Sequence, residues 1–251
     1  MDTRAEQGTP TKVQPNEVAW DRYSCPNRST ECNNHLSRKG MCGRIAQIDT
    51  PDELAELMGI TDGLESLDHV QTAYNVPPSS KLASLVAGAE RGIKWVPLEW
   101  GMRPSWMKSK RAMINARCET VNQRPMFKRS FASRRCVIPA TAYYEWLLGP
   151  RGKQPYCIRT SSREPLLLAG LYAGGQCVIL TRAARDDLAF IHDRMPVAMP
   201  REWISPYLQD LTAAFASFTA ADALDLVYYP VTRRVGSPRF NTPECLEPID
   251  D

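Results

Sequence analysis

The fold is decided by a stretch in the second half of the chain that reads Leu166-Leu167-Leu168-Ala169-Gly170-Leu171-Tyr172, then Ala173-Gly174-Gly175, then Gln176-Cys177-Val178-Ile179-Leu180-Thr181. Both outer runs are apolar and of strand length. The Gly-Gly pair between them is typical of a tight turn that joins two antiparallel strands. We therefore predict a β-hairpin over 166–181 and expect the other elements to lie on both sides of it.

Further short strands are expected on both sides of this hairpin, and they outnumber the helices. We expect strands at 42–48, 82–86, 94–99, 136–139, 142–147, 156–159 and 227–231, and helices at 51–58, 124–134 and 182–190. The connections between them are mixed. This pattern predicts an α+β fold, with a single domain that has a curved, mostly antiparallel β-sheet or barrel-like core and short flanking helices.

The first helix has the clearest local signals. Thr50 is the expected N-cap, Pro51 is the first helical residue, and Glu53 is the residue that returns a hydrogen bond to the cap. The helix is expected to end near Gly59.

The composition is that of an ordinary globular protein. Hydrophobic residues make up 43% of the 251 residues and charged residues 24%, with a formal net charge of +3. This small charge does not indicate a general nucleic-acid binder, although it permits a local basic groove. No apolar run reaches the roughly eighteen residues that a membrane helix needs, and the chain does not open on an apolar signal region.

Residues 1–40 differ from the rest, because they are polar and show no helix or strand period. We expect them to be a disordered or non-native N-terminal extension, with the domain over 41–245. Cys25, Cys32 and His35 could be three metal ligands, but their spacing matches no common zinc site and a fourth ligand is missing. We therefore expect no metal. Without a secretion signal, the eight cysteines are expected to be free thiols.

Two residues stand out as candidates for acid–base chemistry. His192, one of three histidines, is either a structural hydrogen-bonding group at a helix end or a catalytic one. Glu145 lies in an aromatic, strand-like run, where a carboxylate is costly to bury unless it is paired or neutral. The residues alone leave open whether Glu145 is salt-bridged or is a tuned acid–base group.

Four short blocks of sequence, in a fixed order, resemble a known family. They are Met41-Cys42-Gly43-Arg44, Ile114-Asn115-Ala116-Arg117-Cys118-Glu119-Thr120, Tyr144-Glu145-Trp146 and Ile191-His192-Asp193-Arg194-Met195-Pro196. Together they resemble the signature blocks of the SOS-response-associated peptidase (SRAP) family, the abasic-site processing proteins. Segments at 74–77, 100–101, 126–128 and 230–232 are similar to family segments as well, so the resemblance covers residues 41–240 or nearly so.

The resemblance implies an enzyme of the DNA-damage response that recognises abasic sites in single-stranded DNA. An N-terminal Cys42 would form a Schiff base with the opened sugar through its α-amine and then close a thiazolidine ring through its thiol. Glu145 would shuttle protons, His192 would assist sugar opening and reversal of the crosslink, and Asn115 would hold the adduct.

The resemblance also implies a set of DNA-binding residues. These are Arg44, Asn75, Trp100, Trp106, Arg117, Lys128 and Arg194. The basic residues would contact phosphates, and the tryptophans would stack on or wedge between bases beside the lesion, with core packing as the alternative for both tryptophans. Met195 stands where the family often has a second basic residue, which would weaken the grip on the DNA backbone.

The implied chemistry requires Cys42 to be the first residue, but 41 residues precede it. Translation could begin at Met41, the protein could cleave itself before Cys42 through the thiol, or the leader could stay and the chain would only bind DNA. Two alternative functions follow, an autopeptidase and a non-covalent single-stranded DNA-binding module. In every case we expect a cytoplasmic monomer, nucleoid-associated when bound to DNA, with no membrane contact and no cofactor. The expected partners are abasic single-stranded DNA and replication-fork proteins.

Overall fold

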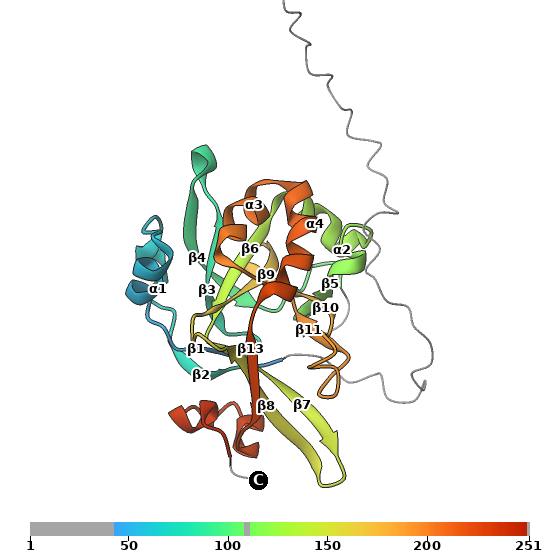
Figure 1. Ribbon diagram of the computed structural model, residues 1–251. Coiled ribbons are helices and arrows are strands. Elements are labelled where there is room, and N and C mark those ends of the chain that lie inside the picture. Colours follow the sequence, from blue (N-terminus) through green and yellow to red (C-terminus); the bar gives the residue numbers. More distant parts are fainter. Residues whose placement is uncertain (1–42, 108–110, 250–251) are drawn as a thin grey trace, which may run out of the picture. The chain divides into compact units, whose positions relative to one another are not determined.

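The computed structural model describes residues 43–107 and 111–249. Within these residues the chain forms thirteen strands and four α-helices (Figure 1). The strands are β1 Ile45–Gln47, β2 Ala73–Val76, β3 Lys81–Ala87, β4 Ile93–Trp100, β5 Asn115–Arg117, β6 Arg135–Ala140, β7 Ala142–Gly149, β8 Gly152–Thr160, β9 Leu166–Ala173, β10 Gln176–Ala183, β11 Arg194–Pro196, β12 Ala198–Met199 and β13 Leu226–Pro230. The helices are α1 Pro51–Met58, α2 Pro125–Ser133, α3 Ile204–Gln209 and α4 Leu211–Ala220. The predicted α+β class is confirmed.

The first sheet has five antiparallel strands in the order β13-β8-β7-β1-β2. Strand β1 is short and lies between β7 and β2, with Ile45 opposite Tyr143 on one side and opposite Val76 on the other. The β7–β8 hairpin extends away from helices α2, α3 and α4 (Figure 1). The first residues of the described chain therefore enter the middle of this sheet.

The second sheet is ring-like and mixed. Its order is β11-β10-β4-β3-β6-β9-β12, and β10 also pairs with β9, so that β10, β4, β3, β6 and β9 close a ring. The pairings of β10 with β4 and with β5 are parallel. The barrel-like core expected from the sequence is thus a ring of strands rather than a true barrel.

The predicted hairpin over 166–181 is confirmed as β9 and β10, with Val178 opposite Leu171. Gly174 and Gly175 have φ angles of 56° and 75°. Residues with side chains rarely adopt two successive positive φ angles, which explains why glycines occupy this turn.

The helix signals at residues 50–59 are also confirmed. The side chain of Thr50 accepts from the backbone N–H of Glu53, the Glu53 side chain accepts from the N–H of Thr50, and Gly59 ends α1 with a φ of 64°. The helix expected at 182–190 is wrong. Strand β10 runs on to Ala183 because Arg182 pairs with Met195 of β11, and turns follow it.

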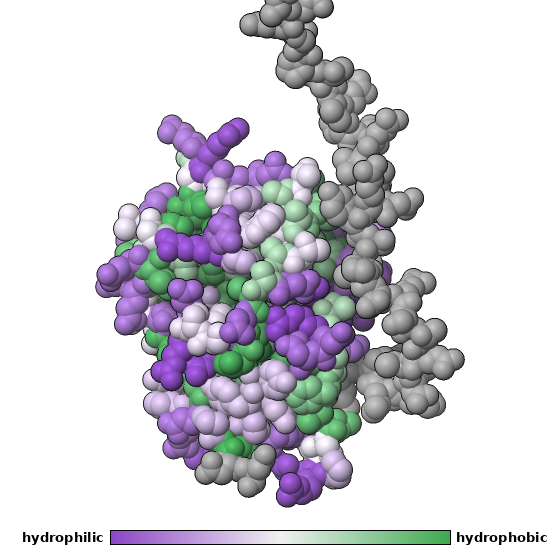
Figure 2. Space-filling model, viewed as in Figure 1, coloured by the Kyte–Doolittle hydropathy of each residue, from purple (hydrophilic) through white to green (hydrophobic). Residues whose placement is uncertain are grey.

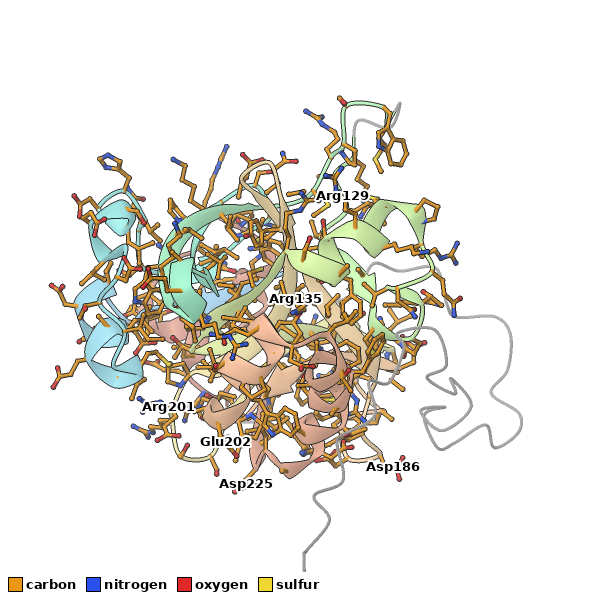
Figure 3. The ribbon with its side chains drawn as sticks, turned by 90° about the horizontal axis from the view of Figure 1, so that it is seen from above. Arg129, Arg135, Asp186, Arg201, Glu202 and Asp225 are labelled. Atoms are coloured by element: carbon orange, nitrogen blue, oxygen red, sulfur yellow. The ribbon has the colours of Figure 1, made fainter. Side chains whose placement is uncertain are left out.

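The core has three parts: one beneath the helices, one between the two sheets, and one in which Tyr144 packs with Val235 and Phe240. Helices α2, α3 and α4 lie together at one end of the ring-like sheet (Figure 1). There the buried Arg135 (Figure 3) donates hydrogen bonds to the backbone carbonyls of Phe131 and Ala132 in α2 and of Tyr207 and Leu208 in α3. One side chain therefore supplies hydrogen-bond donors for carbonyl groups at the ends of two helices.

Between the sheets, residues such as Ile45, Tyr143 and Ile158 of the first sheet pack against Trp100 and Ile179 of the second. The face in Figure 2 is mostly polar, with apolar residues in separate groups. In the part of the chain that the structure describes, no helix is both long and apolar enough to cross a membrane.

Candidate functional site

A small pocket gathers the two acid–base candidates. It lies between strands β7 and β8 and the segment that leads into β11, and it joins Glu145 with His192 although 46 residues separate them in the sequence. The residues that line it are Tyr143, Glu145, Ile158, Leu188, Ile191, His192, Arg194 and Met195. Its walls are therefore largely apolar, with a carboxyl group, an imidazole, a guanidinium and the Tyr143 hydroxyl as the polar groups.

Glu145 is 5% exposed, and one carboxylate oxygen, Oε1, accepts a hydrogen bond of 3.0 Å from the backbone N–H of Trp146. It stands opposite Tyr156 on the neighbouring strand β8. A buried carboxyl group at the edge of an apolar pocket can give a proton to, or take one from, a molecule bound there.

His192 is held at one of its two ring nitrogens. Nδ1 lies 3.0 Å from the backbone nitrogen of Arg194 and 2.9 Å from Oδ1 of Asp193. The Arg194 N–H requires a lone pair on Nδ1, whereas the Asp193 carboxylate requires a proton there, so the two contacts belong to different protonation states of the ring. In both states Nδ1 is engaged within the protein, and Nε2 is the nitrogen that can exchange a proton with a substrate.

The start of the described chain pairs with β7, the strand that carries Glu145. The Tyr144 N–H donates to the Arg44 carbonyl at 3.0 Å, which extends the pairing of β1 with β7. Continued by one more residue, this register would bring Gly43 opposite Glu145. A Cβ atom built on Gly43 would lie 3.5 Å from Cδ1 of Ile114. Cys42 itself lies outside the described residues, but its neighbour Gly43 lies next to Ile114, the residue before Asn115.

Asn115 and Arg117 belong to β5, which pairs with β10 in parallel and places Asn115 opposite Ile179. The two residues are two positions apart on a strand, so their side chains share one face of it. Arg117 is exposed, and Asn115, which follows Ile114, is half-buried.

Three of the predicted DNA-binding residues are buried. Trp100 is 0% exposed, with its indole N–H bonded to the Ile114 carbonyl at 3.0 Å, so the core-packing alternative applies to it. Asn75 is 2% exposed and Arg44 is 8% exposed, and they are bonded to each other. Burial keeps these side chains from the surface, so the structure does not support direct DNA contact by any of the three.

Arg194 is held by Glu119. Nη2 of Arg194 donates to Oε2 of Glu119 at 2.8 Å and to the Thr181 carbonyl at 2.7 Å, and Nη1 donates to Oε1 of Glu119. Burial is the largest single influence on Glu119 and would raise its pKa. The hydrogen bonds and the charge of Arg194, together with hydrogen bonds from the backbone, outweigh burial and lower that pKa overall. This partner of Arg194 was not identified from the sequence.

A second hollow of about 520 Å³ lies between the loop 102–106, helix α2 and the β9–β10 turn. Trp106 lines it and is 67% exposed. Three arginines line it as well, Arg103, Arg129 and Arg134, and Figure 3 shows Arg129 on α2. Sequence reasoning did not name these arginines, although the basic run at 124–134 was a signal for two of them. Lys128, on the same helix, is exposed.

Five cysteines lie within the described residues, and all are buried free thiols, as predicted; they are Cys118, Cys136, Cys157, Cys177 and Cys245. Burial raises the pKa of Cys157 to about 11 and shifts Cys136, Cys177 and Cys245 upward as well. Thiols held in the protonated form are poor nucleophiles. Cys25, Cys32 and His35, weighed above as metal ligands, lie outside the described residues.

Sequence comparisons with known proteins all lead to one family. The family model described as SOS response associated peptidase (SRAP) matches residues 41–238. The abasic site processing protein YoqW of Bacillus subtilis is 33% identical over 230 residues, which cover 82% of this chain and 99% of YoqW. The abasic site processing protein YedK of Escherichia coli is 30% identical over 227 residues, covering 83% of this chain and 100% of YedK.

A crystal structure of a protein from Bacteroides thetaiotaomicron has the same fold, with a TM-score of 0.67 and 19% identity, over 83% of this chain and 100% of that one. The matched family region includes both strands that border the start of the described chain and the whole pocket around Glu145 and His192. The chain belongs to the SOS response associated peptidase family.

Proposed function

We propose that this protein recognises abasic sites in single-stranded DNA and bonds to them covalently through Cys42, once Cys42 is the first residue of the chain. The names of the similar proteins YoqW and YedK, abasic site processing proteins, support the substrate. The observation that carries the mechanism is the hydrogen bond from the Tyr144 N–H to the Arg44 carbonyl. It holds the chain two residues after Cys42 against β7, beside Glu145, which lines the same pocket as His192.

The proposed chemistry is a condensation. An abasic deoxyribose opens to an aldehyde, and the α-amine of Cys42 attacks its carbon. Loss of one water gives an imine. The Cys42 thiol then adds across the C=N bond, so that a C–S bond forms, the thiol proton moves to nitrogen, and a five-membered thiazolidine results. An α-amine suits this reaction because its ordinary pKa of about 7.7–8.0 leaves much of it neutral at physiological pH.

The pocket residues would move the protons of this reaction. Glu145 would protonate the departing hydroxyl of the first adduct and later relay the thiol proton to the imine nitrogen. His192 would act through Nε2 in opening the sugar and in reversing the crosslink. Asn115, on the strand that follows Ile114, would hydrogen-bond the adduct.

DNA contact is proposed for the exposed members of the predicted set. Arg117 and Lys128 would meet phosphates, and Trp106 would stack on a base beside the lesion. Arg194 would reach a phosphate only by leaving Glu119. The three arginines that line the hollow with Trp106 would add positive charge for the phosphate backbone.

In the active protein, the domain would span residues 41–245, and residues 1–40 would be an extension outside it. An internal Cys42 has its nitrogen in an amide, and an amide nitrogen cannot form the imine. Removal of residues 1–41, or translation from Met41 followed by loss of that methionine, would supply the free amine.

A denaturing gel tests the proposal. Protein that begins at Cys42 should shift an abasic oligonucleotide irreversibly, and Cys42→Ala should not. A complex that appears only on a native gel and weakens steeply with salt would instead identify a non-covalent binder.

The family's name supports a second candidate, an autopeptidase. In this version the Cys42 thiol attacks the carbonyl carbon of Met41, and the Cys42 nitrogen leaves as a free amine. Water then hydrolyses the thioester that results, which releases residues 1–41 and restores the thiol. Incubation of the full chain should then release residues 1–41, as read by intact mass, and Cys42→Ala should block the release. A full chain that keeps its mass would rule this candidate out.

A further inference from the structure

Asn75 ties a C-terminal segment of the chain to the strand that follows Cys42. Its side-chain nitrogen donates to three backbone carbonyls, those of Val235 at 3.1 Å, Ser237 at 2.9 Å and Phe240 at 2.6 Å. Its oxygen accepts from Nη1 of Arg44 at 2.9 Å. One buried amide therefore connects β2, the segment 235–240 and the residue two positions after Cys42.

Other bonds hold the same parts together. Nη1 of Arg44 also reaches the Val235 carbonyl at 3.2 Å. The backbone N–H of Tyr74, next to Asn75, donates to Oδ1 of Asn241 at 2.7 Å. The hydroxyl of the buried Tyr144 donates to the Tyr74 carbonyl at 2.6 Å. We call this set the brace; it consists of Arg44 and Asn75 with Val235, Ser237, Phe240 and Asn241.

The brace and the pocket hold the same short strand from opposite sides. Strand β1 pairs with β7, which carries Glu145, and with β2, which carries Asn75. β1 has only three residues. So short a strand makes few backbone hydrogen bonds to its neighbours. The side-chain hydrogen bonds of Arg44 therefore add to the bonds that hold the start of β1 in place.

We infer that Asn75 and Arg44 are positioning residues that set the place of Cys42 relative to Glu145. The other residues of the brace act on the reaction through them. The inference rests on the proposed function, because it assumes that Cys42 is the reacting group. A small misplacement of a reacting group slows a reaction by orders of magnitude without changing how tightly the substrate binds. Disrupting the brace should thus lower the rate of crosslinking at saturating DNA.

Crosslinking kinetics over a range of DNA concentration separate this role from a phosphate contact. Protein beginning at Cys42 is mixed with excess abasic oligonucleotide, and the covalent product is followed on denaturing gels. For Asn75→Ala we expect the maximal rate to fall at least about tenfold while half-saturating DNA stays within about twofold. A phosphate contact would raise half-saturation and reduce its salt dependence instead, which would overturn the inference.

Because Asn75 is buried, Asn75→Ala also removes folding stability, so a second variant is needed. Asn241 is exposed, and Asn241→Ala removes one bond of the brace without opening a cavity. We expect the same pattern for Asn241→Ala, with a smaller loss of rate of about threefold. Arg239→Ala is the matched control, an exposed change in the same segment outside these bonds. Equal maximal rates for Asn241→Ala, Arg239→Ala and wild type would contradict the brace.

Amide hydrogen exchange gives a readout that does not depend on crosslinking. Both Asn75→Ala and Asn241→Ala should speed exchange at residues 44–47, whereas Arg239→Ala should not. If wild type makes no adduct, the proposed function fails, and unchanged exchange in both variants would separately overturn the brace.

Discussion

Glu119 and Arg194 form a two-point ion pair, in which both carboxylate oxygens of Glu119 accept from the two terminal guanidinium nitrogens of Arg194. The pair joins the turn after β5 to β11, and Thr181 of β10 adds a third contact. Arg194 also lines the pocket with His192 and Glu145. This ion pair therefore fixes one wall of the site.

The ion pair gives a pH-dependent stability with a defined sign. The pKa of Glu119 lies below its ordinary value of 4.5, so its contribution is present above that value and is lost as the pH falls through the folded-state pKa. We expect Glu119→Gln to lower the free energy of unfolding at neutral pH by on the order of 1 kcal/mol, with an allowance for partial exposure. Urea unfolding at about pH 7 and about pH 3 measures this, and an equal loss at both pH values would contradict it.

Glu145→Gln should slow crosslinking and leave the fold intact. The substitution keeps the shape of the side chain but removes its ability to carry a proton. General acid–base catalysis accounts for about a hundredfold to ten-thousandfold in rate, and we expect a loss within that range. Product formation is followed on denaturing gels, with thermal unfolding as the control. Equal rates for mutant and wild type would remove the role assigned to Glu145.

His192→Ala should impair release of the crosslink by about a hundredfold. Asp193→Asn should have a smaller effect, because Nδ1 keeps its contact with the Arg194 N–H. Loss of Asn75 should also impair release less than His192→Ala does. Preformed adduct is isolated and its decay is followed by gel. Release rates that are the same in wild type and His192→Ala would refute the assignment.

The two tryptophans should respond in opposite ways. Trp106→Ala should weaken binding of single-stranded DNA by about tenfold, since stacking on one base contributes about 1–3 kcal/mol, and it should leave the melting temperature unchanged. Trp100→Ala should cost about 3–5 kcal/mol of folding stability because it empties a core position. Fluorescence anisotropy and thermal unfolding provide the two measurements. Unchanged DNA affinity in Trp106→Ala would exclude the stacking role.

Local chemistry explains which parts of the fold could be predicted. The Gly174-Gly175 turn and the capping box of Thr50 and Glu53 each depend on neighbouring residues, and both were found from the sequence. Helices α3 and α4 were not. Helix α3 is short and contains Pro206, and α4 is apolar on most of its surface, so neither shows a one-sided apolar stripe. Their packing against the ring-like sheet is a tertiary effect.

The site was predicted unevenly for the same reason. Glu145 and His192 were chosen for their chemistry, and the structure brings both to one pocket. The burial of Trp100, Asn75 and Arg44 could not be read from their neighbours, because it depends on how the two sheets and the segment 235–240 cover them. The sequence shows the type of each residue, but whether its side chain is buried or exposed depends on the whole fold.

The proposed reaction requires that the free α-amine and the thiol of Cys42 together capture the abasic sugar. Intact mass spectrometry of the denatured reaction mixture tests this most directly. Protein beginning at Cys42 should give a species equal to protein plus oligonucleotide minus one water, and Cys42→Ala should give none. The full 251-residue chain with its leader retained should also give none. An equal yield of adduct from a chain that keeps residues 1–41 would contradict the account.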